Sequence, residues 1–293
     1  MPDLHDTLGV VELPRDFVRV AGPDAMKFLQ GQLSQQVDVA VGTSAWTLLL
    51  QPQGKVVALL RVTRTGAEEY LLDTDGGWAA AVVERLNRFK LRVKADIEVL
   101  DGWKCLAVRG PAAGEAVPDG GLPADWPGLP GVDVVGPAGE VEAPLGVPSV
   151  SLDDYEVARI EAGVPVMGRE LVESTIPAEA GVVDRSVSFT KGCYTGQELV
   201  ARIDSRGGNV PRRLRGVVVE GDEVPPAGAT VHTVGDDGGK EVGVLTSVAR
   251  SERLGSAVAL AYVRRAVEPP AGVELRWDGG RAPAQVLTLP LVP

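Results

Sequence analysis

The chain contains 293 residues, which is too long for one ordinary domain and short for three full ones. Hydrophobic residues make up 44% of it and charged residues 24%, so we expect a globular protein with a core. The 29 Lys and Arg residues are outnumbered by 40 Asp and Glu residues, and the resulting net charge of −11 disfavours non-specific binding to nucleic acid or anionic lipid.

The N-terminal sequence and the number of cysteines exclude further classes of protein. The first six residues have no basic region followed by an apolar stretch, so we expect no signal peptide. The longest apolar runs, such as 56–60, are far shorter than a membrane span. The two cysteines, Cys105 and Cys193, lie far apart, which excludes a disulfide framework and a four-thiolate metal site. We therefore predict a cytoplasmic protein with no contact to membranes or nucleic acid and no metal site.

The predicted elements begin with a helix after a Gly-Pro turn at 22–23, marked by an apolar stripe from Phe28 to Leu33. A second helix is predicted from Ala79 to Leu86, where apolar residues recur at helical spacing, and Asp75 is its expected N-terminal cap. Short runs rich in β-branched or large apolar residues predict strands at 46–50, 56–62, 70–72 and 97–100.

An internal similarity indicates how these elements are organised. Residues 20–25 resemble residues 108–113, since both read as a strand end, a Gly-Pro turn and a helix start. The pair predicts one α+β domain that is interrupted by a second one. We therefore predict a discontinuous α+β domain made of 1–45 and 104–210, with an α+β domain inserted at 46–103.

In the second half of the chain the predicted type of secondary structure changes twice. Gly and Pro crowd residues 110–148, which predicts loops and short edges, and a helical pattern returns from Leu152 to Gly163. Beyond Arg215 no segment has a helical period, and turn sequences at 236–239 and 278–280 separate strand-like runs at 216–219, 242–247, 257–262, 273–277 and 284–289. We predict a C-terminal β-barrel over residues 211–293, with a sandwich as the alternative.

The segment around Cys193 combines a thiol with the signals of a helix start. Thr195 and Glu198 have the spacing of a capping box, so a helix is predicted to begin just after Thr195. Cys193 would then lie directly before a helix N-terminus and two residues after Lys191, and both surroundings favour the thiolate. The alternative is that Cys193 is a small buried side chain beside Tyr194. Cys105, in a strand-like run, is predicted to be core.

The remaining polar side chains give fewer candidates for catalysis or ligand binding. His5 and His232 are the only histidines, so a His-based triad or a two-histidine metal site is nearly excluded. Arg159 and Glu161 either line a pocket or pair in solvent. A local positive group follows the cysteine segment and suits a carboxylate-bearing ligand, with surface ion pairs as the alternative; it comprises Arg202, Arg206, Arg212, Arg213 and Arg215.

The segment Lys191–Glu198, K-G-C-Y-T-G-Q-E, resembles the K-G-C-Y-x-G-Q-E motif of the folate-binding YgfZ family, which is related to the glycine-cleavage T protein, an aminomethyltransferase. Further similarity covers 22–32, 159–163, 175–181, 242–247 and 257–263, whereas 115–148 match nothing in the family. The resemblance implies a three-domain ring of two α+β domains and a C-terminal β-barrel, in which the discontinuous domain binds tetrahydrofolate near the centre.

The resemblance also implies a role in the assembly or repair of iron–sulfur enzymes, with Cys193 as the key residue and Lys191 tuning its thiolate. Iron–sulfur client enzymes or assembly proteins are then the expected partners. Two cysteines cannot supply a four-thiolate cluster site, so contact with a cluster would be shared, transient or indirect. The residues expected to bind the folate or shape its site are Gly192, Tyr194, Gly196, Gln197, Glu198, Arg159, Glu161 and Arg202.

One departure from the T protein bears on the reaction. The T protein carries an acidic pair after its Q-x-G-G turn, whereas here the turn at 51–54 is followed by Val57 and Ala58 at those positions. Neither side chain can transfer a proton, so we expect no glycine-cleavage activity. Two alternatives to an accessory protein stay open, namely a folate-dependent aminomethyltransferase or demethylating enzyme and a non-catalytic scaffold with a vestigial folate pocket.

Overall fold

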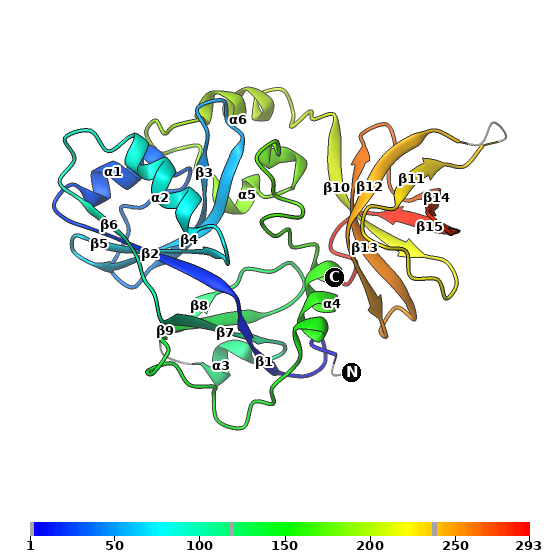
Figure 1. Cartoon of the computed structure of the whole chain (residues 1–293), viewed down its shortest axis with the longest axis horizontal. Helices are drawn as coiled ribbons and strands as arrows, with labels where there is room; N and C mark the ends of the chain where they lie inside the picture. The colour runs from blue at the N-terminus through cyan, green and yellow to red at the C-terminus, as the bar shows by residue number, and fades with distance from the viewer. Residues whose placement is uncertain (1–2, 118–119, 236–238) are drawn as a thin grey trace.

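The first sheet is antiparallel and is built mainly from the first hundred residues of the computed structural model, which describes residues 3–117, 120–235 and 239–293. Its strand order is β3-β4-β5-β2-β6. Helices α1 (Ala25–Gln32) and α2 (Ala79–Arg88) pack against it, as Figure 1 shows. The strands are β2 (Arg15–Ala21), β3 (Ser44–Leu50), β4 (Val56–Gly66), β5 (Glu69–Asp75) and β6 (Asp96–Val99).

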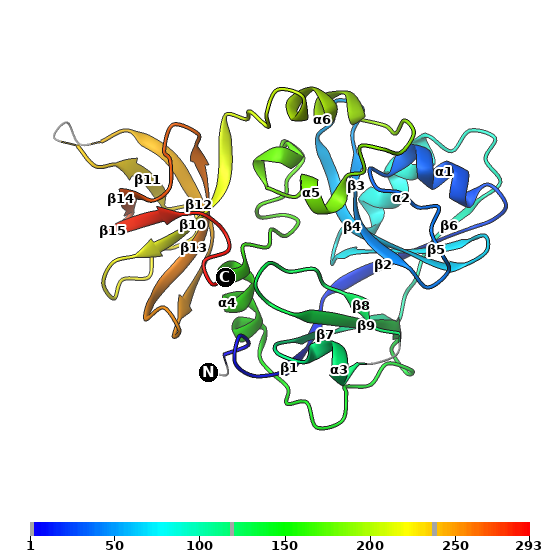
Figure 2. The ribbon, with the colours of Figure 1, turned by 180° about the vertical axis from the view of Figure 1, so that it is seen from behind.

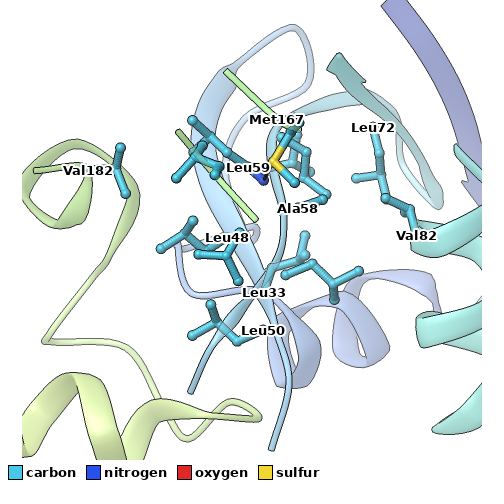
Figure 3. Close-up of a cluster of buried hydrophobic side chains, with 14 of the residues drawn as sticks. Leu33, Leu48, Leu50, Ala58, Leu59, Leu72, Val82, Met167 and Val182 are labelled. Atoms are coloured by element: carbon cyan, nitrogen blue, oxygen red, sulfur yellow. Dashed lines mark hydrogen bonds between the residues drawn. The ribbon is translucent and has the colours of Figure 1, made fainter. Parts of the chain in front are cut away.

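A continuous hydrophobic cluster holds the helices on this sheet (Figure 3). Leu48 and Leu50 of β3 and Ala58 of β4 are fully buried, and Leu33, directly after α1, and Val82 of α2 meet them. The apolar residues whose spacing predicted these helices and strands therefore pack into one core. The expected cap of α2 was wrong, because Asp75 lies in β5 and the N-terminal amide of Ala79 donates to Asp16 Oδ2 at 2.7 Å instead.

The second sheet has the order β1-β7-β9-β8 and carries the short helix α3 (Ala113–Ala116). Its strands are β1 (Gly9–Leu13), β7 (Trp103–Arg109), β8 (Leu122–Pro123) and β9 (Gly131–Pro137). Strand β9 is a regular element within the segment predicted as loops and short edges. Cys105 of β7 is fully buried against Phe17 and Leu71, which confirms that it belongs to the core.

The strand pairing corrects one detail of the predicted domain organisation. Strand β2 pairs with β5 on one side and β6 on the other, so the sheet formed by 46–103 also includes residues 15–21. The chain passes from β1 in the second sheet to β2 in the first through Pro14 alone. The segment 46–103 therefore does not complete a sheet without the N-terminal strand, and the other domain boundaries stay a prediction.

Helix α4 (Leu152–Ala162) lies between the second sheet and the barrel in both views (Figures 1 and 2). Ser151 and Asp154 form a capping box at its start, and Gly163 ends it in the left-handed conformation. The helix packs beside β1, β12 and β13. The connection that follows contains three short helices, η1 (Pro177–Glu179), α5 (Val183–Ser186) and α6 (Gln197–Asp204).

The C-terminal strands close into a barrel with the order β10-β13-β12-β11-β14-β15 (Figure 2), which decides for the predicted barrel over the sandwich. The bounds are β10 (Arg212–Val219), β11 (Thr230–Thr233), β12 (Glu241–Ser251), β13 (Ser256–Arg264), β14 (Ala271–Trp277) and β15 (Gly280–Leu287). Small and branched side chains such as Val217, Ala259 and Leu275 fill its interior. Of the predicted turn at 236–239, residues 236–238 lie outside the described part of the chain.

The predicted fold class, α+β with a C-terminal barrel, is thus confirmed. Among the helices of the described residues, none combines the length and the apolar character needed to cross a membrane.

Candidate functional site

The cysteine motif forms a loop that leads into α6. The helix begins at Gln197, and Gly196 precedes it as N-cap in the left-handed conformation with φ +87°. The predicted capping box is wrong, because a capping side chain must stand directly before the helix and Gly196 occupies that place. Thr195 instead turns toward α1, where its backbone amide donates to the Gly31 carbonyl at 3.1 Å.

Two contacts explain why the loop needs these residue types. A Cβ atom on Gly196 would lie 2.6 Å from the Gln51 carbonyl oxygen and 2.8 Å from Leu50 Cβ, so only glycine allows α6 to start against the 51–54 turn. Tyr194 is buried in the main core, and its backbone amide donates to Gln197 Oε1 at 3.0 Å. Tyr194, Gly196 and Gln197, all expected at the folate site, therefore shape the loop itself.

Lys191 fastens the same loop to the end of α1. Its Nζ donates to the carbonyl oxygens of Gln30, Leu33 and Gln35 at 2.8, 2.5 and 3.0 Å. The ammonium also lies 5.3 Å from the centre of the Tyr194 ring. Burial lowers the pKa of Lys191 to about 8. Because its three N–H groups are used at α1, the structure gives Lys191 an anchoring role, and its effect on the Cys193 thiolate stays a prediction.

Cys193 itself is exposed, so the alternative of a buried filler beside Tyr194 is wrong. Its neighbour Gly192 is exposed as well, and Glu198 lies exposed on the first turn of α6. Cys105 differs in every respect, since it is fully buried and burial raises the pKa of its thiol. The protein therefore offers one accessible thiol, held on a loop whose backbone is anchored on both sides.

A second candidate site is a small cavity, with about 30 Å3 of free space, between the two sheets, α4 and α5. Its aromatic lining comprises Trp46, Trp126 and Tyr155, and its cationic lining comprises Arg15, Arg109, Arg159 and Arg185. None of the eight residues of the cysteine motif lines it. The structure therefore separates the exposed thiol from this cavity, whereas we expected a single site.

Buried ion pairs form the wall where the two sheets meet. Arg61 of β4 is fully buried and binds Asp73 of β5 at 3.0 Å and Asp133 of β9 at 2.9 Å, and Arg109 of β7 binds Asp133 at 2.8 Å. Burial alone would raise the pKa of Asp133, but Arg109 and Arg61 hold it below its ordinary value. The cluster stays ionised and ties the first sheet to the second.

Arg159 and Glu161 are both buried, so the expectation that they pair in solvent is wrong. Arg159 lines the cavity and donates to Glu156 at 2.6 Å and to Ser247 of the barrel at 2.7 Å. Glu161 reaches away from the cavity, where it accepts from Ser251 at 2.5 Å and lies 3.1 Å from His5 Nε2. Of the two, only Arg159 is placed to meet a ligand of this cavity.

The arginines after the motif do not converge. Arg202 and Arg206 are exposed, and Arg212 pairs with Glu179 at 3.1 Å and lies 4.4 Å from the Tyr262 ring. Arg213 donates to the Gly208 carbonyl at 2.6 Å. These contacts match the alternative of separate local pairs better than one anion site, and a folate contact of Arg202 stays a prediction.

Sequence reasoning missed Trp46, Arg61, Asp133 and Arg185. One signal was present, because a charged residue such as Arg61 inside an apolar strand needs a buried partner. The position of that partner, more than 70 residues away, was not visible in the pattern.

Comparison with known proteins shows which families this chain is similar to. Residues 15–119 match the GCVT N-terminal domain, and residues 212–293 match the glycine cleavage T-protein C-terminal barrel domain. The chain is 31% identical to an aminomethyltransferase of Streptomyces avermitilis, over 93% of this chain and 83% of that protein.

Two further relatives carry other names. The chain is 31% identical to the tRNA-modifying protein YgfZ of Edwardsiella ictaluri, over 66% of this chain and 65% of that protein. It is 29% identical to an iron-sulfur cluster assembly factor IBA57 homolog of Neurospora crassa, over 66% of this chain and 49% of that protein.

The fold agrees with these relatives. The structure of the glycine cleavage system aminomethyltransferase T from Bartonella henselae superimposes with a TM-score of 0.83 at 23% identity, over 99% of this chain and 88% of that one. The predicted T-protein-like fold is thereby confirmed, and the chain belongs to the glycine cleavage T-protein family, as a YgfZ-like member.

Proposed function

We propose that this protein binds tetrahydrofolate and serves the assembly or repair of iron–sulfur enzymes through Cys193. The observation that carries the proposal is the exposed Cys193 on a loop whose neighbouring side chains, Lys191, Tyr194 and Gln197, are engaged in holding the loop. A thiol that takes no part in packing is available for chemistry with a partner. The name of the IBA57 homolog, an iron-sulfur cluster assembly factor, points to the same process, whereas the YgfZ relative is named as a tRNA-modifying protein.

The iron–sulfur cluster is cargo in this proposal. Cys193 is the one exposed cysteine, so this chain can offer a cluster one thiolate ligand, and the remaining ligands come from the client or from an assembly protein. In the residues that the structure describes, no group of three or more His, Cys, Asp or Glu side chains is arranged to hold a metal ion. Contact with the cluster is therefore shared and depends on the partner.

The lining of the cavity between the two sheets suits tetrahydrofolate in two ways, and its lining side chains must move to admit the ligand because the free space is about 30 Å3. The aromatic walls of the cavity, Trp46, Trp126 and Tyr155, suit the planar ring of a pterin. Arginine side chains face the same space, and guanidinium groups recognise carbonyl and carboxylate oxygens. When bound, tetrahydrofolate would supply one-carbon chemistry, while the protein's residues would bind and orient it and exclude water.

The proposal is tested in cells that lack the protein. We expect Cys193→Ala to abolish rescue of iron–sulfur enzyme activity while the purified variant keeps the melting temperature of the wild type, because the side chain is exposed. The matched control is Cys105→Ala, which removes a buried thiol and is expected to lower stability but to keep rescue. Full rescue by Cys193→Ala would disprove the role of the thiol.

An aminomethyltransferase is the second candidate, favoured by identity to an enzyme of that name over most of both chains. Against it stand Val57 and Ala58, the first partly buried and the second fully buried, at the positions of the T protein's acidic pair. We expect no methylene transfer to tetrahydrofolate in the presence of the carrier protein, and measurable transfer would overturn that expectation.

Calorimetric titration of tetrahydrofolate into the purified wild type separates the accessory protein from a scaffold with a vestigial pocket. We expect saturable binding of one ligand per chain. Absence of heat and of a shift in melting temperature at high ligand concentration would favour the scaffold.

A further inference from the structure

A separate pocket lies beside the helix that follows the cysteine loop. It has about 140 Å3 of free space, and its walls come from the segment that contains η1 and α5, from α6 and from the chain around the start of β10. It shares no lining residue with the cavity between the two sheets. Its larger apolar lining residues are Ile176, Pro177, Val183, Val200 and Ile203.

The walls of this pocket are held in place by the surrounding structure. Val200 of α6 is buried in the main hydrophobic core. The turn that ends α6 is closed by the amide of Gly208, which donates to the Ile203 carbonyl at 3.0 Å, and Arg213 Nη2 donates to the Gly208 carbonyl at 2.6 Å. The free space is enough for one aromatic or aliphatic side chain, since an apolar cavity of about 150 Å3 takes up benzene.

The charged side chains of the pocket are two aspartates and one arginine. Asp184 of α5 and Asp204 of α6 are exposed, and within the described part of the chain neither carboxylate makes a hydrogen bond or an ion pair. The hydrogen bond of Arg213 goes to the Gly208 carbonyl instead. The pocket therefore combines an apolar hollow with unpaired negative charge, which is complementary to an apolar side chain that has a cation beside it.

The position of the pocket relates it to Cys193. The cysteine loop leads directly into α6, which lies between the first sheet and the barrel (Figure 1). At a rise of about 1.5 Å per residue, Ile203 lies about 9 Å along the helix from its first residue, Gln197. Arg202 of the same helix lines no part of the pocket. Because an ordinary protein interface covers about 800 Å2 on each partner, a protein seated in the pocket also reaches the cysteine loop.

We infer that this pocket, formed by η1, α5, α6 and β10, is the docking site of the partner protein that meets Cys193. The partner inserts one apolar side chain against Val200 and Ile203, and a Lys or Arg beside that side chain pairs with Asp184 and Asp204. The net charge of −11 attracts a basic partner as well. The inference rests on the proposed function for the encounter with Cys193.

Charge reversal in cells tests the docking. Cells that lack the protein receive the wild type, a pocket variant that combines Asp184→Lys with Asp204→Lys, or a control that combines Asp101→Lys with Asp278→Lys. Asp101 and Asp278 are exposed in turns and line no part of the pocket, so the control changes the same charge elsewhere. We expect the pocket variant to lose at least tenfold in rescued iron–sulfur enzyme activity and the control to match the wild type.

Purified chains show whether that loss comes from docking. The pocket variant should keep the melting temperature and the single accessible thiol of the wild type, because the substituted side chains are exposed and have no partner in the described residues. A milder variant that combines Asp184→Asn with Asp204→Asn should show a smaller loss of rescue. Selection for restored activity of the pocket variant should yield a partner protein in which a Lys or Arg has become Asp or Glu.

Three probes that share a phenyl ring test the chemistry of the pocket, namely 2-phenylethylamine, 2-phenylethanol and phenylacetate. The methyl NMR signals of Val200 and Ile203 report binding. We expect the amine to bind at least threefold more tightly than the alcohol and phenylacetate to bind most weakly. The order should reverse in the pocket variant, because its charge is reversed.

Other results overturn the inference or the proposed function separately. Full rescue by the pocket variant disproves the docking and leaves the proposed function standing, even if the amine binds, since the pocket then takes a small molecule. Loss of rescue with a lowered melting temperature in both the Lys and the Asn variants shows a structural role and disproves the inference. Equal affinities for the three probes disprove the charge complementarity. Full rescue by Cys193→Ala with none by the pocket variant disproves the role of the thiol and upholds the docking.

Discussion

At the scale of single residues, the two cysteines have opposite environments. Cys193 is exposed on the loop before α6, and Cys105 is fully buried in the core beside Phe17. Thiol reagents attack the accessible thiolate, so the folded protein should present one reactive thiol per chain. We expect a disulfide reagent such as Ellman's to titrate one thiol rapidly in the native protein and two in denaturant. Cys193→Ser should abolish the rapid phase, and two rapid equivalents in the native state would contradict this assignment.

The burial of Lys191 leads to a prediction about how the free energy of unfolding depends on pH. Burial lowers its pKa to about 8 in the folded protein, from an ordinary value of 10.5. The cost of burying its charge is fully present below pH 8 and disappears as pH rises toward 10.5, because over that window the unfolded chain holds more protons at this residue. We expect the free energy of unfolding of the wild type, relative to Lys191→Met, to increase from pH 8 to 10.5 in urea titrations.

The control for Lys191 is a lysine on the same helix that it anchors. Lys27 is exposed on α1, and Lys27→Met should give a difference from the wild type that does not change over this pH range. A flat profile for Lys191→Met would mean that the three carbonyls at the end of α1 keep the ammonium charged.

At the scale of elements, the start of α6 depends on one glycine of the motif and not on the other. Gly196 has φ +87° and faces the Gln51 carbonyl, whereas a Cβ on Gly192 would meet no atom within 4 Å. We expect Gly196→Ala to cost about 2–4 kcal/mol, from backbone strain and overlap together. Gly192→Ala should stay within about 0.5 kcal/mol of the wild type. Equal stabilities of the two variants in denaturant titrations would contradict the close approach of α6 to the 51–54 turn.

At the scale of the whole molecule, the two sheets are held together by buried charge as well as by apolar contact. Arg61 is fully buried and joins Asp73 of the first sheet to Asp133 of the second. Removing one partner of such a cluster leaves uncompensated charges, so Arg61→Met should cost about 3–5 kcal/mol of unfolding free energy. Arg19→Met, which removes a half-exposed partner of Glu69 in the same first sheet, should cost about 0–1 kcal/mol. A small effect of Arg61→Met would show that water or side-chain rearrangement satisfies the aspartates.

The sequence by itself determined the elements whose signals are local. Helices α1, α2 and α4 and the strands of the barrel follow from apolar periods and turn residues, which act over a few neighbours in the chain. The buried state of Cys105 follows from the same strand pattern. Similarity to a family motif likewise identified the segment around Cys193, because it depends on the order of residues alone.

Only the tertiary structure decided what depends on residues far apart in the chain. Strand β2 entered the first sheet because β5 and β6 offer it backbone partners, a choice that its own composition does not reveal. Cys193 became exposed because Tyr194 beside it turned into the core and Gly196 closed against the 51–54 turn. The cavity arises where long-range packing brings separate charged segments together and ion pairs satisfy Arg15, Arg109 and Arg159.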